Sequence, residues 1–232
     1  MGDPGDGSKL KNSPLVFSRL FDDKNLLFLT SERHVMNNTA TYREAIQRCR
    51  ELLERAQAVD LSEPMGVSLA TVDLDGQPSV RMVLLRGFDE RGFVFYTNSQ
   101  SRKGRELDHN PRAALCFYWD ALREQLRVQG KAERVSDEES DTYWEKRPRL
   151  SQLAAVASRQ SEILEDPQIL VDRVAELERR YENGPVPRPD HWYGYRVVPA
   201  RIEFWTGRDG RMHERSIYED SGQGWTSFFV YP

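Results

Sequence analysis

The 232-residue sequence contains little cysteine and no long apolar run. Its two cysteines, Cys49 and Cys116, are too far apart for a CxxC pair, so neither a disulfide framework nor a zinc site is expected. Such cysteine usage suits a reducing compartment, and we expect a cytoplasmic protein. No apolar stretch approaches the roughly 18 residues that a membrane span needs.

Positive charge is not in excess either. The chain has 33 Lys and Arg residues against 37 Asp and Glu residues, a formal net charge of −4. Because nucleic-acid binding depends largely on excess positive charge, no nucleic-acid partner is expected.

Common catalytic motifs are also missing. The chain has no GxSxG nucleophile elbow, no GxxxxGK[ST] phosphate loop and no GxGxxG after a strand. The four histidines, at positions 34, 109, 191 and 213, do not have the spacing of metal ligands. These absences argue against serine hydrolases, nucleoside triphosphate enzymes and metalloenzymes, and no metal is expected.

The first 40 residues form a separate segment in the sequence pattern. Residues 1–12 are polar and rich in glycine, and residues 15–30 hold short apolar clusters without a clear period. This extension either packs on the body or is poorly ordered. A helical apolar period then begins near Thr41, and its predicted buried stripe consists of Tyr42, Ala45, Ile46, Cys49, Leu52, Leu53 and Ala56.

From residue 65 onward the period changes to that of strands. Strands are predicted at 67–72, 79–85, 93–97, 113–119, 125–134, 194–205 and 212–218, with a further candidate at 225–230. Turns are predicted at 73–76 and 87–92, and helices after Ser101, after Ser136 and at about 166–182. We therefore expect residues 41–232 to form one domain, mainly antiparallel β with flanking helices, arranged as a barrel.

Cations gather at a predicted helix start. Arg102 and Lys103 follow Ser101, where free backbone N–H groups and positive side chains suit a phosphate. The alternative is an ordinary basic helix start on the surface.

Two further segments carry cations and hydroxyls. If 212–218 is a strand, Arg211, His213 and Arg215 lie on one face of it, either around an anionic ligand or on a solvated edge. Tyr143 and Arg147 are i, i+4 neighbours near a helix end, a spacing that suits a phosphate ester but is common on helix surfaces.

Taken together and in this order, the segments RMVLLR, FYTNSQSRKGREL, RPRLSQ, ASRQSE, EFWTG and RMHER resemble those of the pyridoxine/pyridoxamine 5′-phosphate oxidase family of FMN flavoproteins. The resemblance covers about residues 65–220. It implies a split β-barrel and a homodimer with two FMN sites between the subunits. The implied activity is oxidation of pyridoxine or pyridoxamine 5′-phosphate to pyridoxal 5′-phosphate, with O2 as acceptor and H2O2 released.

The resemblance also implies site residues. Those implied for FMN are Arg81, Met82, Val83, Leu84, Leu85, Arg86, Tyr96, Thr97, Arg102, Lys103, Gln125, Gln160, Ser161, Trp205 and Arg215. Those implied for the substrate are Arg86, Tyr143, Arg147, Ser151, Arg211 and His213, of which Arg211 and His213 are the candidate catalytic pair.

Three departures from the family pattern touch the substrate side or the chain ends. Arg86 replaces the usual lysine, Phe229 stands where arginine is expected, and no R-R-x-Y segment precedes Thr41. Two alternatives therefore accompany the oxidase reading. One is a relative that oxidises a different substrate, such as a phenazine-type ring, and the other is a flavin- or pyridoxal-phosphate-binding protein with little catalysis.

Overall fold

The computed structural model describes the backbone from Asp23 and the side chains from Ala40 to the C-terminus; predictions for residues 1–22 lie outside the described residues. The chain divides after Met36 into two compact units. The larger unit, Asn37–Pro232, contains the sheet, the cores and the cavity described below. The first helix, α1 (Asp23–Ala58), begins earlier than the predicted start near Thr41.

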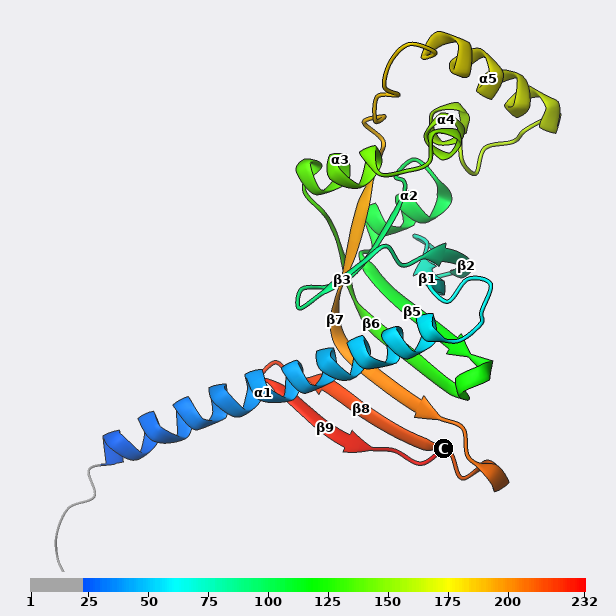
Figure 1. The fold of residues 1–232 in the computed structure, drawn as a ribbon. Coiled ribbons are helices and arrows are strands. Elements are labelled where there is room, and N and C mark those ends of the chain that lie inside the picture. The colour runs from blue at the N-terminus through cyan, green and yellow to red at the C-terminus, as the bar shows by residue number, and fades with distance from the viewer. Residues whose placement is uncertain (1–22) are drawn as a thin grey trace, which may run out of the picture. The chain divides into compact units, whose positions relative to one another are not determined.

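The strands of the described region form one antiparallel sheet, ordered β2-β1-β5-β6-β7-β4-β3, with β8 and β9 added beside β7 (Figure 1). Their bounds are β1 (Gly66–Val72), β2 (Pro78–Leu84), β3 (Gly87–Asp89), β4 (Gly92–Asn98), β5 (Arg112–Trp119), β6 (Glu124–Arg134), β7 (Trp192–Thr206), β8 (Glu214–Asp220) and β9 (Trp225–Phe229). The predicted antiparallel sheet with flanking helices is confirmed.

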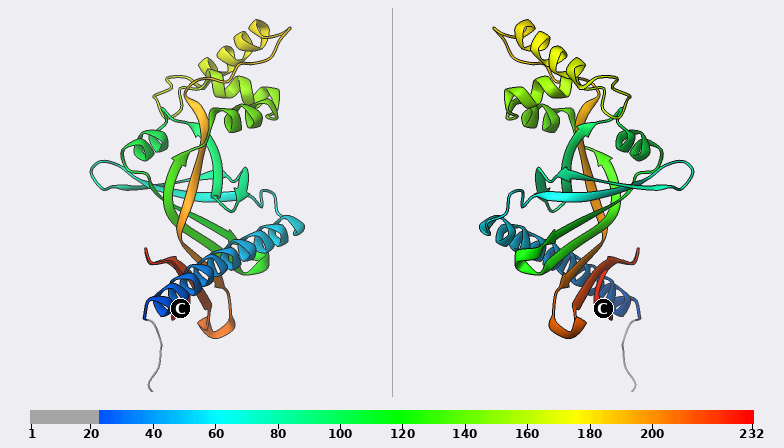
Figure 2. Two further views of the ribbon diagram at one scale, coloured as in Figure 1. Left: turned by 90° about the vertical axis from the view of Figure 1, so that its left-hand side faces the viewer. Right: turned by 90° about the vertical axis from the view of Figure 1, so that its right-hand side faces the viewer.

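Strand β7 organises this sheet. One of its edges pairs with β6 from Tyr195 to Thr206, while the other pairs first with β4 and then with β8. A register shift at Gln129 and Gly130 of β6 lets the long pair bend. Helices α3 to α5 lie at one end of β7, and the β8–β9 hairpin lies at the other end (Figure 2).

The main core lies under α1. The predicted stripe is confirmed: Ala45, Ile46, Cys49, Leu52, Leu53 and Ala56 are buried, and Tyr42 packs against them half-buried. They face inward-pointing strand residues such as Leu69, Phe95 and Phe117. None of the helices in the described part of the chain has the length and apolar character that crossing a membrane requires.

The remaining helices are α2 (Arg102–His109), α3 (Asp137–Glu145), α4 (Arg149–Ala157) and α5 (Pro167–Arg180). Ser101 and Ser136 cap α2 and α3, as their positions predicted. The sequence pattern missed α4, whose Leu153 packs with Trp144, Val186 and Trp192 in a second, smaller core. This core holds α3 and α4 on the start of β7.

Two local predictions are wrong. The predicted turn at 87–92 contains β3, which pairs with β4. Strand β8 starts at Glu214, later than the predicted residue 212, because a 3-10 turn, η2 (Asp209–Arg211), precedes it. Gly210 and Arg211 both have positive φ in this turn, which a strand does not allow.

Gly104 lets α2 pack against the chain that enters it. A Cβ atom there would lie 2.0 Å from the carbonyl oxygen of Ser99, so Gly104→Ala must displace the start of α2. We expect the free energy of unfolding to fall by about 2 kcal/mol, measured by denaturant unfolding. Gly184→Ala is the control, since no atom lies within 4 Å of its Cβ position; equal stability of the two variants would contradict the assignment.

Candidate functional site

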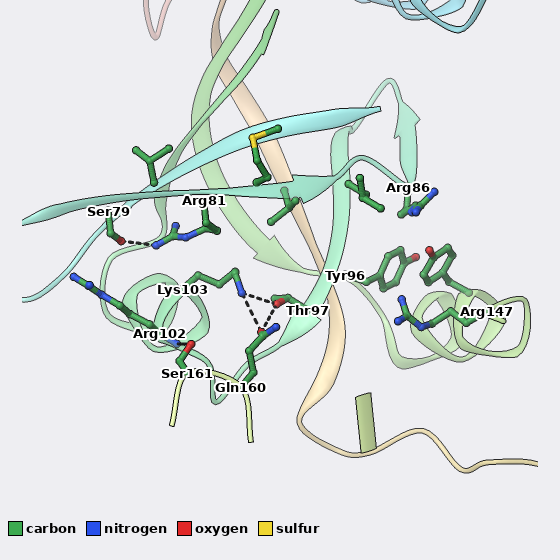
Figure 3. A pocket seen from close by; sticks show the side chains of 15 residues that line it. Ser79, Arg81, Arg86, Tyr96, Thr97, Arg102, Lys103, Arg147, Gln160 and Ser161 are labelled. Carbon is green, nitrogen blue, oxygen red and sulfur yellow. Dashed lines mark hydrogen bonds between the residues drawn. The ribbon is translucent and has the colours of Figure 1, made fainter. Parts of the chain in front are cut away.

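A cavity of about 580 Å³ opens between β2, β4, α2, the end of α3 with the segment after it, and the segment that follows α4 (Figure 3). All but two of its lining residues are predicted site residues. The lining consists of Ser79, Val80, Arg81, Met82, Val83, Leu84, Arg86, Tyr96, Thr97, Arg102, Lys103, Tyr143, Arg147, Gln160 and Ser161. The structure thus brings together segments that are up to 82 residues apart in sequence.

One end of the cavity is built as an anion site around the start of α2. The backbone N–H of Arg102 donates to Ser161 Oγ at 3.1 Å. The Lys103 ammonium donates to Gln160 Oε1 at 3.0 Å and to Thr97 Oγ1 at 3.2 Å. A helix N-terminus with two cations suits a phosphate group, as the sequence predicted.

Lys103 is buried among neutral partners. Burial, and after it the positive charge of Arg81, lower the pKa of Lys103 to about 8, against the raising effect of Glu106. A bound phosphate would supply the negative charge that this ammonium lacks.

The sequence pattern missed Glu106, which lies on α2 behind the cavity. Its buried carboxylate accepts from Arg102 Nε at 2.8 Å and from Arg81 Nη2 at 3.0 Å. Although burial raises the pKa of Glu106, hydrogen bonds from Thr71, Ser79, Arg102 and Arg81 outweigh it and lower that pKa to about 2. The spacing of four residues from Arg102 was the one signal in the sequence that could have identified it.

Stacked aromatic rings and guanidinium groups form the other end. The rings of Tyr96 and Tyr143 stack at 4.0 Å, and the Arg147 guanidinium lies 4.9 Å from the Trp192 ring centroid. Burial, and after it the charge of Glu139, raise the pKa of Tyr96 to about 12, so its hydroxyl keeps its proton. Arg86 projects near these groups from the end of β2 (Figure 3).

Arg147 has an unsatisfied donor. Its Nη2 donates to the carbonyl oxygen of Ser151 at 3.3 Å, but its buried Nε–H has no hydrogen-bond partner. Ser151 itself lines a second cavity of about 380 Å³, which shares Tyr96, Thr97, Arg147 and Gln160 with the first. The two cavities are therefore neighbours across these shared walls.

Some predicted residues lie elsewhere. Leu85 is buried in the main core. Gln125, Trp205, Arg211, His213 and Arg215 do not line the cavity but gather where β6, β7 and β8 meet. There the Trp205 and His213 rings lie 4.6 Å apart, and Arg215 Nε donates to the buried Glu203 at 2.8 Å.

The predicted single face with Arg211, His213 and Arg215 is wrong. Only Arg215 belongs to β8, whereas Arg211 ends the η2 turn with φ 61°. His213 follows the turn, and its Nδ1 accepts from the backbone N–H of Arg208 at 3.1 Å. The chain reversal between β7 and β8, and not the alternation of side chains along a strand, brings these groups to one end of the sheet.

The two groups of site residues are far apart in one chain. Tyr96 in the cavity pairs with Gly194 near the start of β7, and Trp205 lies eleven residues further along that strand. At about 3.3 Å per residue this corresponds to about 36 Å along β7. The two groups therefore lie towards opposite ends of β7 in one chain.

Comparisons with known proteins identify the family of the chain. Residues 52–181 match the family described as pyridoxamine 5′-phosphate oxidase, and residues 192–232 match the pyridoxine 5′-phosphate oxidase C-terminal dimerisation region. The second match indicates a homodimer.

Relatives were found in both sequence and structure. The chain is 52% identical over 189 residues to the pyridoxine/pyridoxamine 5′-phosphate oxidase of Myxococcus xanthus, covering 82% of this chain and 92% of the relative. It is 57% identical over 179 residues to that of Rubrobacter xylanophilus, covering 77% and 82%. Among solved structures, PhzG from Burkholderia lata in complex with tetrahydrophenazine-1-carboxylic acid matches with TM-score 0.77 and 34% identity, covering 81% of this chain and 92% of that one.

The ionisation of Lys103 predicts how phosphate binding depends on pH. Above pH of about 8 the free protein loses the Lys103 charge, so the affinity of the cavity for FMN should fall as pH rises from 8 to 9.5. Titration of FMN fluorescence checks this, with riboflavin, which lacks the phosphate, as the ligand control.

Lys103→Arg is the matched variant, because a guanidinium stays charged throughout this range. It should remove the alkaline fall in FMN affinity. An equal alkaline fall in wild type and Lys103→Arg, or in FMN and riboflavin, would assign the pH dependence to another group.

Proposed function

Because the chain belongs to the pyridoxamine 5′-phosphate oxidase family, we propose that it is an FMN-dependent oxidase of pyridoxine and pyridoxamine 5′-phosphates. With O2 as the electron acceptor, pyridoxine 5′-phosphate gives pyridoxal 5′-phosphate and H2O2. Pyridoxamine 5′-phosphate gives the same products but also takes up water and releases ammonia. The observation that carries the proposal is the cavity, which combines a phosphate-binding helix start with a separate set of cations and hydroxyls on its opposite side.

The residues present fit FMN. Its phosphate finds Arg81, Arg102 and Lys103 around the start of α2, where Lys103 has only neutral partners. The strand from Arg81 to Leu84 forms a flat wall beside them. FMN held by these residues would supply the redox chemistry, taking a hydride from the C4′ carbon of the substrate and passing the electrons to O2.

The substrate phosphate fits the opposite side of the cavity. Arg86, Tyr143 and Arg147 line it, and the free Nε–H of Arg147 is a donor that a phosphate oxygen would satisfy. Ser151, which lies in the adjoining cavity, is the nearest additional hydroxyl from α4. Arg86 keeps the charge of the family's lysine but offers a planar fork in place of a point charge.

We place both active sites between two copies of the chain. The separation of about 36 Å along β7 keeps Gln125, Trp205 and Arg215 away from the cavity of their own chain. A two-fold related partner can supply them. In a two-fold interface, this group of one copy can meet the cavity of the other copy, and the reverse contact then forms as well. The match of β7 to β9 with a dimerisation region supports this arrangement.

Arg211 and His213 would then reach the substrate from the partner. The backbone N–H of Arg208 occupies His213 Nδ1, so the proton of the neutral ring is on Nε2, which is free to donate to the substrate. Arg211 is exposed at the end of η2 and can supply charge to the pyridine ring.

A second candidate function has one specific observation in its favour. The matching PhzG structure holds tetrahydrophenazine-1-carboxylic acid, so the same fold accommodates a phenazine-type ring. The identity to PhzG is 34%, below the 52% and 57% to the two oxidases above, and a phenazine carboxylic acid has no phosphate to use Arg86, Tyr143 and Arg147. We therefore rank it second.

The activity is tested by anaerobic titration of the FMN-loaded protein. Pyridoxamine 5′-phosphate should bleach the flavin absorbance, and admission of air should restore it with formation of H2O2 and pyridoxal 5′-phosphate. Bleaching by a reduced phenazine carboxylic acid but not by either B6 phosphate would favour the second candidate. If dithionite reduced the flavin but none of these substrates did, the protein would be a flavin-binding protein with little catalysis.

Arg211→Ala separates substrate contacts from cofactor contacts. We expect flavin reduction by pyridoxamine 5′-phosphate to slow by about 10-fold or more, the loss of one charged hydrogen bond, while FMN stays bound. Stopped-flow absorbance measures the first quantity and flavin content the second. Loss of FMN from this variant would instead make Arg211 a cofactor residue.

Hybrid dimers test the shared site. Chains with Lys103→Ala and chains with Arg215→Ala are co-expressed with different tags, and the heterodimer is isolated. If each site uses one group from each chain, the heterodimer keeps one native site and binds half the FMN of wild type. If both groups served the same chain, the heterodimer would bind no more FMN than the two parent variants.

A further inference from the structure

Glu106 does not line the cavity, yet it is the most heavily bonded acidic group near it. Its side chain is 4% exposed, and it lies on α2 between the cavity and the β1–β2 hairpin. A buried carboxylate is costly unless charged and polar partners surround it. Its partners therefore indicate what it does.

Four side chains donate to this carboxylate. Ser79 Oγ donates at 2.7 Å to Oε2 and at 2.9 Å to Oε1, and Thr71 donates to Oε2. Arg81 Nη2 lies 3.0 Å from Oε2, and Arg102 Nε lies 2.8 Å from Oε1. The carboxylate thus joins two strands of the sheet to helix α2.

The two arginines are the important partners because both line the cavity. Arg102 is a half-exposed side chain at a helix start, and its other ion pair, with Asp73, is longer at 3.8 Å, so without Glu106 its guanidinium would be held less firmly. Arg81 is held further by the carbonyl oxygen of Leu69 at 3.2 Å and by the hydroxyls of Thr71 and Ser79. Among the side chains that the structure describes, Glu106 is the one group bonded to both guanidinium groups.

The charges around α2 also match a phosphate. Arg81, Arg102 and Lys103 carry three positive charges, and Glu106 and Asp73, which lies 3.8 Å from Arg102, carry two negative charges. This end of the cavity therefore keeps a net positive charge that attracts a phosphate. Without Glu106 the two arginines would repel each other and Lys103 at short range. Glu106 thus lets three cations stand together before any ligand arrives.

We propose that Glu106 is a positioning residue for the cofactor phosphate, which fixes the Arg81 and Arg102 guanidinium groups in their binding orientation. The proposal rests on the FMN site proposed above. It predicts a contribution specific to the phosphate, because neither arginine is needed for the flavin ring. The preorganised pair should bind FMN more tightly than flexible arginines would.

Glu106→Gln tests this by comparing two ligands. The amide keeps the size of the side chain, but its NH2 group cannot accept from an arginine, so one guanidinium is released. We expect the dissociation constant of FMN to rise about 10- to 100-fold, as for other supporting residues, and that of riboflavin to stay within about 2-fold. Fluorescence titration of the flavin-free protein measures both.

Two further variants separate positioning from general stability. Glu90→Gln is the control, because Glu90 bonds Arg50 at 3.3 Å and neither residue lines the cavity. Glu106→Asp, which keeps the charge but shortens the side chain, provides a second measurement if the glutamine variant folds poorly. In an Arg102→Ala background, Glu106→Gln should cost less FMN affinity than it does alone.

The outcomes are distinct. Equal losses of FMN and riboflavin affinity in Glu106→Gln, or no loss of either, would overturn the positioning role. The same loss with and without Arg102 would overturn the pathway through that arginine. Failure of the wild-type protein to bind FMN would instead overturn the proposed function itself.

Discussion

The pairing of β7 is the constraint on which the rest of the structure depends. This strand lies against β6 along most of its length and divides its other edge between β4 and β8. The pairing with β4 positions the cavity, since β4 contains Tyr96 and Thr97 and leads into α2. The pairing with β8 positions the group around Trp205 and His213. The length of one strand therefore decides which functional residues a single chain can bring together.

The site also depends on charged side chains that are buried. Lys103, Glu106 and Glu203 are charged side chains largely removed from water, and each has a dense set of hydrogen bonds or ion pairs. Such groups add little net stability compared with apolar residues, since desolvation offsets much of their attraction. Their value here is orientation. Glu106 fixes Arg81 and Arg102, and Glu203 fixes Arg127 and Arg215.

Much of the fold followed from local pattern, because local physics decides it. The buried stripe of α1, the hairpin strands and the capping serines of α2 and α3 all have a period or a short motif in the sequence. Helix α4 has no such signal: its burial comes from Trp144, Val186 and Trp192, which reach it from other elements.

The site was predictable in part, from short sequence motifs. The family motifs identified nearly all of the cavity lining, yet strand alternation misplaced Arg211. Its turn depends on distant partners, including the hydrogen bond from Gly207 to the carbonyl oxygen of Arg123. Glu106 looks like a surface glutamate in GREL until the β1–β2 hairpin covers it.

The distance between the two groups along β7 has a thermodynamic consequence. In the shared site proposed above, a flavin that requires both groups would bind the dimer and not the separated chains, so cofactor binding and assembly would be linked by mass action. Saturating FMN would stabilise the dimer in proportion to the logarithm of its free concentration. Dilution would release subunits and flavin together, and the occupancy of each site would depend on the concentration of the protein itself.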